Sequence, residues 1–193
     1  MIKWHYTFAL TICGIAELDT YCNHKVTHLL SLADPDWIEA GVVGAFAPDR
    51  RLALRFHDII EPQPARLPPD REDIVRLLAF TRDLLPGDHL LVHCHAGISR
   101  STAAAALILA QAEPARPARD VLQRVTELRP SAWPNLRMLE LGDALLGRGG
   151  EIPTAARLVY RRALARDPAF ADLIIANGRG REISAALSSP ALA

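Results

Sequence analysis

The chain has 193 residues, of which 50% are hydrophobic and 23% are charged. These proportions are typical of a soluble globular domain and exclude extensive disorder. Lys and Arg together number 22, and Asp and Glu also number 22, so the formal net charge is zero. A neutral chain has no overall field that would attract nucleic acid or an acidic membrane, so neither partner is expected.

The cysteine count and the apolar segments bear on the compartment. The cysteines, three in all, are Cys13, Cys22 and Cys94. They are too few and odd in number for a disulfide framework, so a cytoplasmic, reducing location is expected. Residues 7–16 resemble a signal-peptide core, but Glu17 and Asp19 follow where small residues would mark cleavage, which favours a strand. The apolar segment 102–112 is too short to span a membrane.

The first part of the chain predicts short strands. Strands are expected at 8–15, 26–32, 42–46 and 52–56, with a short helical connection at 17–25. Residues 26–32 are almost continuously apolar, which is typical of a strand buried on both faces. In the last strand, Leu52, Leu54 and Phe56 fall on one face. Residues 57–69 contain four prolines and no periodicity, so they predict a loop, and loops of this length are often functional.

The rest of the chain predicts helices around one more strand. Asp70 is expected to cap a helix that ends at Pro86-Gly87. The apolar run 90–92 follows that helix directly, which indicates a parallel strand. Residues 101–112 are apolar on every side and predict a fully buried helix. Further helices are expected at 118–128, 135–146, 156–164 and 169–176.

Strands that alternate with helices indicate an α/β fold, with a mostly parallel central sheet flanked by helices. The glycine cluster Gly147-Arg-Gly-Gly150 is the candidate domain boundary. We therefore expect a main domain over 1–148 and a helical C-terminal extension over 149–193. The last residues of that extension, 188–193, are expected to fray.

One segment carries the elements of a reaction. It reads His93-Cys94-His95-Ala96-Gly97-Ile98-Ser99-Arg100-Ser101 and lies between a predicted strand and a predicted helix. Such a junction presents free backbone N–H groups and the positive end of a helix dipole, which suit an oxyanion. The five residues between Cys94 and Arg100 are enough to wrap the backbone around a phosphate. Gly97 can take the positive φ of such a wrap, and Arg100 can hold two phosphate oxygens. These surroundings are expected to favour the thiolate of Cys94, a nucleophile.

The segment resembles the signature of the cysteine-dependent protein tyrosine phosphatases, H-C-x-x-G-x-x-R-S/T. The dual-specificity branch commonly has Ala before the Gly and Ser before the Arg, and the chain matches both. Three other segments are similar to the family more weakly. They are Val26-Thr-His-Leu-Leu, like an early strand; Arg129-Pro130 with Pro134-Asn135, like the R-P…P-N segment; and Leu54-Arg-Phe-His-Asp58-Ile with Glu61-Pro62, like the strand and loop of the catalytic acid. The resemblance covers about the first three quarters of the chain and leaves out the residues after Gly150.

The resemblance assigns roles residue by residue. It implies that Cys94 is the nucleophile and that Arg100 binds phosphate. Ser101 would hydrogen-bond the thiolate and help it leave, and His93 would orient the loop. Asp58 would be the general acid. The phosphate-binding loop would comprise His95, Ala96, Gly97, Ile98, Ser99 and Arg100.

Alternatives remain for several side chains. Glu61 is the second candidate for the acid. Cys13 and Cys22 are interpreted as small buried hydrophobic residues, and a redox role for either is left open. His57 and His89 are expected to have structural roles. Arg161, Arg162 and Arg166 are expected to lie on a solvated helix face rather than on a partner surface.

A metal site at His93-Cys94-His95 is also conceivable, because imidazole and thiolate bind zinc. Adjacent residues rarely converge on one ion, and no CxxC or HExxH motif accompanies them, so no metal is expected. His95 is instead expected to lie at the pocket entrance.

The resemblance implies a hydrolase that acts on phosphate monoesters through a phosphocysteine, without a cofactor. Its substrates would be phosphorylated proteins, phosphotyrosine first, or small phosphomonoesters, and phosphate analogues would inhibit it. A phosphoresidue-binding module without turnover and a sulfur-transfer or arsenate-reducing enzyme are the alternatives. The loop length and the Ser101 hydroxyl favour phosphate. The physiological substrate and the oligomeric state stay open.

Overall fold

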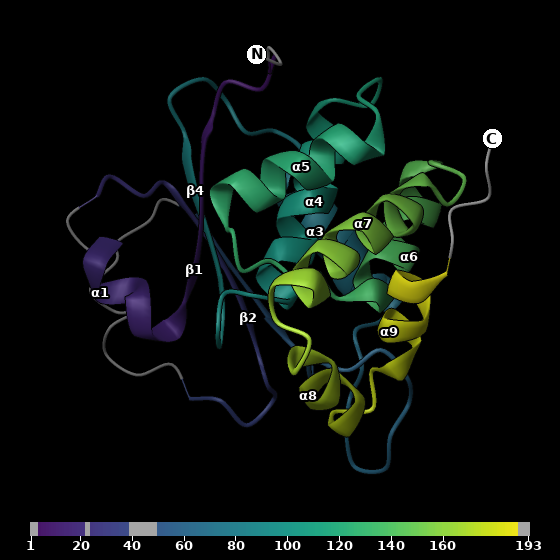
Figure 1. Ribbon diagram of the computed structural model, residues 1–193. Helices are drawn as coiled ribbons and strands as arrows, with labels where there is room; N and C mark the ends of the chain where they lie inside the picture. Colours follow the sequence, from purple (N-terminus) through teal and green to yellow (C-terminus); the bar gives the residue numbers. More distant parts are fainter. Residues whose placement is uncertain (1–3, 22–23, 39–49, 189–193) are drawn as a thin grey trace.

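The computed structural model describes residues 4–21, 24–38 and 50–188, and its centre is a four-stranded sheet (Figure 1). The strands are β1 (Ala9–Gly14), β2 (His28–Ala33), β3 (Arg50–Arg55) and β4 (His89–Cys94). They lie in the order β1-β4-β2-β3, and each neighbouring pair is parallel. This confirms the predicted parallel α/β fold. The strand expected at 42–46 lies outside the described residues.

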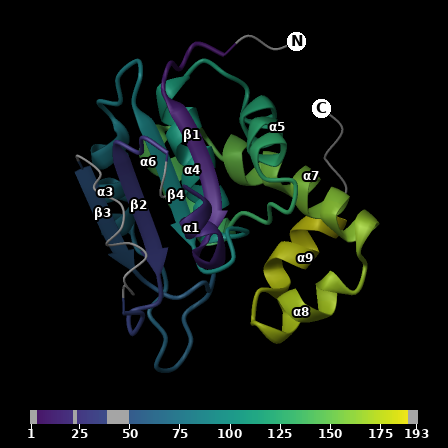
Figure 2. The same ribbon diagram turned by 90° about the vertical axis from the view of Figure 1, so that its left-hand side faces the viewer.

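Helices cover both faces of the sheet. They are η1 (Ile15–Glu17), α1 (Leu18–Tyr21), α3 (Arg71–Thr81), α4 (Arg100–Ala112), α5 (Ala118–Leu128), α6 (Leu136–Leu146), α7 (Glu151–Arg166), α8 (Phe170–Ala176) and α9 (Gly180–Leu187). In Figure 1 the sheet is seen nearly edge-on, with α1 on one side and α3 to α7 on the other. Figure 2 shows α8 and α9 near the end toward which the strands point. In the described part of the chain, no helix has the length and apolarity needed to cross a membrane.

The buried helix α4 organises the main core. Its residues from Arg100 to Ala110 are all buried, whereas the apolar run predicted burial as far as residue 112; Gln111 is partly buried and Ala112 is exposed. Residues 103–106 are four consecutive alanines. Their short side chains allow the sheet and the neighbouring helices to approach the axis of α4 closely. Strand β2 is buried along its whole length, which confirms the interpretation of 26–32 as a strand covered on both faces. Because α4 begins where β4 ends, their junction lies at the carboxyl end of a central strand.

Helix α3 begins as predicted but ends early. The Asp70 carboxylate accepts a hydrogen bond from the backbone N–H of Asp73 at 2.9 Å, which confirms the cap. The helix ends at Thr81, whereas the sequence indicated that it would continue to Pro86. The Asp88 carboxylate accepts the N–H of Leu85 at 2.7 Å and so stabilises a turn there instead. Leu85 itself is 64% exposed and does not anchor the helix to the core.

The core continues into the C-terminal helices. Ile152, Val159 and Tyr160 of α7 belong to the same hydrophobic cluster as the residues that cover the sheet. The Tyr160 hydroxyl donates to the Pro134 carbonyl at 2.5 Å, and its ring lies 4.6 Å from that of Trp133, centroid to centroid. The glycine cluster thus marks the break between α6 and α7, while the division into two domains there stays a prediction. The frayed tail was expected at 188–193, and residues 189–193 lie outside the described ones.

Asp143 joins α6 to α7. It is 4% exposed, and its carboxylate accepts the N–H groups of Gly150 and Ile152, the latter at 2.9 Å. Asp143→Ala would leave the buried N–H of Ile152 and the partly buried N–H of Gly150 without this acceptor, and we expect it to lower the free energy of unfolding by about 1–3 kcal/mol. Urea denaturation measures this. Glu151→Ala, which removes an exposed ion pair with Arg148, should change it by less than about 0.5 kcal/mol. Equal losses in the two variants would contradict the role of Asp143.

Candidate active site

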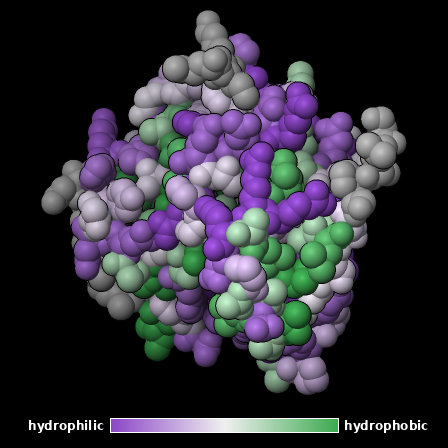
Figure 3. All heavy atoms as spheres, viewed as in Figure 1, coloured by the Kyte–Doolittle hydropathy of each residue, from purple (hydrophilic) through white to green (hydrophobic). Residues whose placement is uncertain are grey.

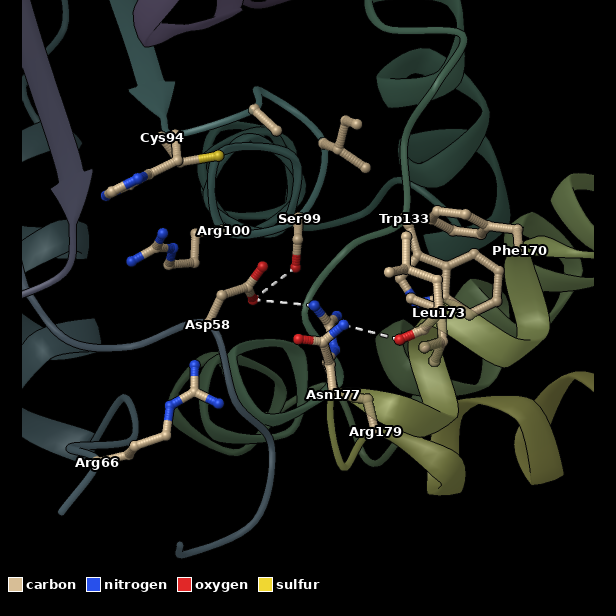
Figure 4. A pocket seen from close by; sticks show the side chains of 14 residues that line it. Asp58, Arg66, Cys94, Ser99, Arg100, Trp133, Phe170, Leu173, Asn177 and Arg179 are labelled. Atoms are coloured by element: carbon tan, nitrogen blue, oxygen red, sulfur yellow. Dashed lines mark hydrogen bonds and ion pairs between the residues drawn. The ribbon is translucent and has the colours of Figure 1, made fainter. Parts of the chain in front are cut away.

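The cysteine loop, residues 94–100, connects β4 to α4 (Figure 4). Cys94 is the last residue of β4 and is 2% exposed. Its Sγ lies 3.2 Å from the Oγ of Ser101, in the first turn of α4. The helix N-terminus therefore faces the sulfur, and a hydroxyl stands ready to donate to a thiolate. Strand and helix are both buried, so the ends of this loop are rigidly held.

The carbonyl groups of the loop all point to its rear. His95 O accepts from Ile15 N (3.0 Å), Ala96 O and Gly97 O accept from the Arg129 guanidinium (3.1 Å each), and Ile98 O accepts from Trp133 N (2.9 Å). In a trans peptide the C=O and the following N–H point in opposite directions. The N–H groups of residues 96–99 consequently point to the front of the loop. Forward-pointing N–H groups of this kind are what an anion-binding loop requires, and anion binding itself stays a prediction.

Arg129 is held in place by a second interaction. Its Nη1 and Nη2 donate to the two carboxylate oxygens of Glu17 at 2.7 and 2.8 Å. The hydrogen bonds from Arg129 lower the pKa of Glu17 below its usual value, although partial burial acts in the opposite direction. Glu17 also accepts the N–H of Gly14 at 2.6 Å. This Glu17–Arg129 pair ties the loop to the end of β1, and sequence reasoning assigned it no role.

Gly97 lies where the loop passes closest to β1. Its φ is +70°, and a Cβ there would lie 2.5 Å from the carbonyl carbon of Cys13 and 2.6 Å from the nitrogen of Gly14. Both atoms are backbone and cannot move aside. A side chain at this position would push the loop away from the strand.

Gly97→Ala should therefore destabilise the protein more than Gly87→Ala, which is a matched control. Gly87 also has a positive φ, +90°, but no atom lies within 4 Å of its would-be Cβ. Each variant should lose about 1–2 kcal/mol from the left-handed backbone, and the steric clash adds to this only in Gly97→Ala. Urea denaturation of both proteins measures the difference. Equal losses would show that the loop does not need this close approach.

Arg100 is positioned by groups that directly follow two other strands, β2 and β3. It is 3% exposed, and its Nη1 donates to the Asp34 carboxylate and to the Phe56 carbonyl, both at 2.6 Å. Its buried Nε–H donates to no atom of the described residues. A buried donor without an acceptor is costly, so an anion that reaches this guanidinium gains a strong hydrogen bond.

Asp58 lies in the loop after β3 and faces the cysteine loop. Its Oδ1 accepts from Ser99 Oγ at 2.7 Å and from Asn135 Nδ2 at 2.8 Å, and it lies 3.0 Å from Arg179 Nη1. Burial alone would raise its pKa. The charges of Arg179 and Arg100, with the hydrogen bonds from Asn135 and Ser99, outweigh burial and lower the pKa below its ordinary value. These contacts engage one oxygen only, so the other can carry a proton.

The pocket in front of the loop has a volume of about 240 Å³. Its walls come from the cysteine loop, the Asp58 loop and the C-terminal helices (Figure 4). Its lining comprises Asp58, Arg66, Cys94, His95, Ala96, Ile98, Ser99, Arg100, Trp133, Phe170, Leu173, Ile174, Asn177 and Arg179. Hydrophobic side chains gather over α8 and α9 in Figure 3, and Leu173 is 55% exposed there. The pocket thus combines a polar base with an apolar wall.

The structure brings most of the predicted site residues together. The nucleophile, arginine and acid candidates share this pocket with His95, Ala96, Ile98 and Ser99. The pocket lining does not include Gly97, which faces β1, or Ser101, whose Oγ contacts the sulfur. His93 is fully buried in β4, with its ring 5.9 Å from that of Trp37. Glu61 lies outside the lining, where its carboxylate pairs with Arg181 at 2.6 Å.

His95 lies at the rim, as expected, with 41% of its side chain exposed. Its Nε2 accepts the N–H of Asp34 at 3.3 Å. Partial burial, followed by the charge of Arg100, lowers its pKa, and nearby carboxylates oppose this. His95 is therefore largely neutral at physiological pH. Among the described residues, no three His, Cys, Asp or Glu side chains gather as a ligand set.

The structure describes one of the two remaining cysteines, Cys13. Cys13 is fully buried in β1, and burial raises its pKa to about 12, with further contributions from Glu17 and Cys94. It is thus protonated and shielded, as a small hydrophobic residue would be. Cys22 lies outside the described residues.

Sequence reasoning missed three residues of the site: Asp34, which contacts Arg100, and Asn135 and Arg179, which contact Asp58. Asn135 had a weak signal, since it belongs to the Pro134-Asn135 segment. It caps α6 through its side-chain oxygen and uses its amide nitrogen on Asp58. Arg179 had none, because it lies in the part of the chain that the resemblance left out.

Comparison with known proteins gives one curated relative and several solved structures. No family model matches the chain. Over 136 residues, 32% of positions are identical to protein phosphatase Slingshot homolog 3 of Homo sapiens. That match covers 68% of this chain but 19% of the human protein, so the chain spans about a fifth of its relative's length.

Solved structures share the fold. The PTP-2 phosphatase of Cydia pomonella is 20% identical with a TM-score of 0.55, over 70% of this chain and 84% of the other. The Yvh1 phosphatase domain from Chaetomium thermophilum is 22% identical with a TM-score of 0.50, over 78% and 96% respectively. Identities this low establish the common fold alone. The match of residues 93–101 to the phosphatase signature comes from the sequence and is independent of these structures.

Proposed function

We propose that this chain, which belongs to the cysteine-dependent protein tyrosine phosphatase superfamily in its dual-specificity-like branch, hydrolyses phosphate monoesters through a phosphocysteine intermediate. One observation carries the proposal: Cys94, Arg100 and most of the residues between them line one pocket, and the buried Nε–H of Arg100 has no acceptor among the described residues. Together they form a site for a tetrahedral oxyanion directly in front of a nucleophile. The reaction needs no group beyond those of the chain and water.

In the first step the Cys94 thiolate attacks phosphorus. An S–P bond forms while the ester P–O bond breaks, and the departing oxygen takes a proton from Asp58. The loop N–H groups and Arg100 stabilise the charge on the equatorial oxygens. The product alcohol or phenol leaves, and the phosphate stays on the sulfur.

In the second step a water attacks the phosphocysteine, and Asp58, now a carboxylate, accepts its proton. The S–P bond breaks, and the electron pair returns to sulfur as a thiolate. The Ser101 hydroxyl, 3.2 Å away, donates to that thiolate and makes it a better leaving group. Inorganic phosphate is released, and the carboxyl proton is back in place for the next cycle.

Asp58 is ionised in the free protein, because its contacts lower its pKa. As the acid it must hold a proton when substrate is bound. A phosphate dianion that enters beside Arg100 brings like charge close to the carboxylate and therefore favours its protonation. The first step needs the protonated carboxyl, which bound phosphate favours. The carboxylate that the second step needs is left once this proton has passed to the departing oxygen.

The apolar wall bears on the substrate. Ile98 from the loop and Phe170, Leu173 and Ile174 from α8 line the pocket beyond the phosphate site. An aromatic leaving group would bury its ring against them, which supports phosphotyrosine ahead of phosphoserine and phosphothreonine. We also propose that the protein acts in the cytoplasm, because a catalytic thiolate needs a reducing environment.

The rival interpretation, a phosphoresidue-binding module, needs no nucleophile. The structure holds the nucleophile, the arginine and a carboxylate in one pocket, which supports turnover. Release of phosphate from 4-nitrophenyl phosphate, unaffected by EDTA, tests the reaction and sets it apart from a metal-dependent one.

Cys94→Ser should abolish turnover of 4-nitrophenyl phosphate while binding of vanadate persists, because the loop and Arg100 remain. A serine hydroxyl is a far weaker nucleophile than a thiolate at neutral pH. Stopped assays and calorimetric titration with vanadate measure the two properties. A Cys94→Ser protein that retains more than a few per cent of kcat would exclude the covalent mechanism.

Asp58→Asn should slow phosphate esters with poor leaving groups far more than activated ones. Phenol and tyrosine oxygens need a proton in the transition state, whereas 4-nitrophenolate leaves almost unaided. Loss of a general acid costs on the order of a hundred- to ten-thousand-fold. The ratio of kcat/KM for phenyl phosphate to that for 4-nitrophenyl phosphate measures the effect.

Glu61→Gln is the control for this experiment, since Glu61 pairs with Arg181 outside the pocket. It should leave the ratio unchanged. If Glu61→Gln lowers the ratio and Asp58→Asn does not, the acid is Glu61.

A further inference from the structure

The turn between α8 and α9 delivers an arginine to the acid candidate. Arg179 is 4% exposed, and its Nη1 lies 3.0 Å from Asp58 Oδ1 (Figure 4). It lies in the C-terminal part of the chain that the family resemblance does not cover. A contact this close, between a buried cation and the carboxylate of the pocket, makes the C-terminal helices part of the site.

The guanidinium of Arg179 is fixed from behind by Glu182. Its Nε and Nη2 donate to the two carboxylate oxygens of Glu182 at 3.0 and 2.8 Å. Glu182 is fully buried and accepts further hydrogen bonds from Trp133 Nε1 at 2.6 Å and from Leu136 N at 3.0 Å. The bidentate contact leaves Arg179 one orientation, in which its remaining edge faces Asp58.

The loop that carries Asp58 also contacts this turn directly. Gln63 Nε2 lies 3.5 Å from the Asn177 carbonyl. A Cβ at Gly178, whose φ is +71°, would lie 2.5 Å from the same Gln63 nitrogen. The α8–α9 turn therefore contacts the loop that carries Asp58 at Gln63 as well as at Asp58 itself.

Charges reach Asp58 from several elements. Arg179 approaches it from the α8–α9 turn and Arg100 from the start of α4, while Ser99 and Asn135 donate neutral hydrogen bonds. His95 lies on the cysteine loop and is neutral for most of the relevant pH range. The two arginines are themselves paired, with Glu182 and Asp34, and Arg66 lines the same pocket. Arg179 is the cation that contacts the Asp58 carboxylate directly.

We propose that Arg179 is a positioning residue for the reaction, which holds Asp58 in the pocket through this ion pair and sets the pH range over which Asp58 can donate a proton. The inference rests on the proposed function, in which Asp58 is the acid. It assigns the C-terminal helices α8 and α9 a part in catalysis rather than in packing alone.

The direction of the effect follows from the charges. A cation beside a carboxylate stabilises its ionised form, so Asp58 loses its proton at a lower pH when Arg179 is present. Activity that needs the protonated acid must then fall at a lower pH. This fall in activity is the alkaline limb of the pH–rate profile, and removal of Arg179 moves it to higher pH. Loss of the ion pair that holds Asp58 lowers the rate at pH values below that limb.

The test uses Arg179→Met, which keeps an unbranched apolar stem and removes the charged guanidinium. Arg179→Lys keeps the charge but loses the planar guanidinium that contacts Glu182 and Asp58 together. Arg181→Met is the matched control, because Arg181 lies two residues further along, in α9, and pairs with Glu61 and Glu140 outside the pocket. Arg179→Met with Glu182→Gln avoids an unpaired buried carboxylate, so a folded protein is obtained even if the single variant is unstable.

Two measurements are made on each protein after thermal unfolding has confirmed its fold. The Asp58 carboxyl carbon is titrated by 13C NMR, and kcat/KM is measured against pH with phenyl phosphate and 4-nitrophenyl phosphate. In Arg179→Met and in the double variant, the Asp58 titration and the alkaline limb for phenyl phosphate should both move up by about one pH unit or more. Below the limb, kcat/KM for phenyl phosphate should fall about tenfold relative to 4-nitrophenyl phosphate. Arg179→Lys should lie in between, and Arg181→Met should match the wild type.

The outcomes separate this inference from the proposed function. A wild-type protein that releases no phosphate refutes the function, and a titration that is the same with and without Arg179 refutes the ion pair whatever the activity. A shifted titration with an unshifted alkaline limb overturns the positioning role, because Asp58 is then not the group that limits the rate. Shifts in both that are absent from Arg181→Met support it.

Discussion

The orientation of four carbonyl groups is the constraint on which the rest of the site depends. Residues 95–98 point their oxygens to the rear, where the end of β1, Arg129 and the segment at Trp133 supply donors. Planar peptides then direct the next four N–H groups forward without any help from a ligand. The loop is thus held by bonds at its rear, so an anion that met its front would find these N–H groups already oriented.

A second set of bonds ties the front of the site to the end of the chain. Glu182 is buried and accepts hydrogen bonds from Arg179, Trp133 and Leu136. Arg179, held in this way, forms the ion pair with Asp58. Trp133 takes part in both sets, since its backbone N–H supports the cysteine loop and its indole N–H supports Glu182. The cysteine loop and the helices that contact Asp58 therefore share one anchor, the segment before α6.

The sequence predicted those features that depend on local pattern. The parallel sheet, the buried helix α4, the cap at Asp70 and the cysteine loop follow from periodicity, capping and a dense motif. The early end of α3 was missed, because a polar side chain, Asp88, decides it from beyond the helix. The Glu17–Arg129 and Asp58–Arg179 pairs were missed because each joins residues far apart in the chain. Single-sequence patterns carry no signal for such pairs, since an arginine that forms one has the same local sequence context as an arginine exposed to solvent.

The distance along the chain between Asp58 and Arg179 also orders the assembly of the protein. The sheet and α4 are complete once residue 112 has been added, and Arg129 and Trp133, which hold the loop carbonyls, follow soon after α4. Arg179 is added only after α4 to α8, and closing the long loop between it and Asp58 has an entropic cost. A nascent chain can therefore form the cysteine loop before Asp58 gains its ion pair. The order of synthesis thus separates two parts of one pocket, the loop and the anchored carboxylate.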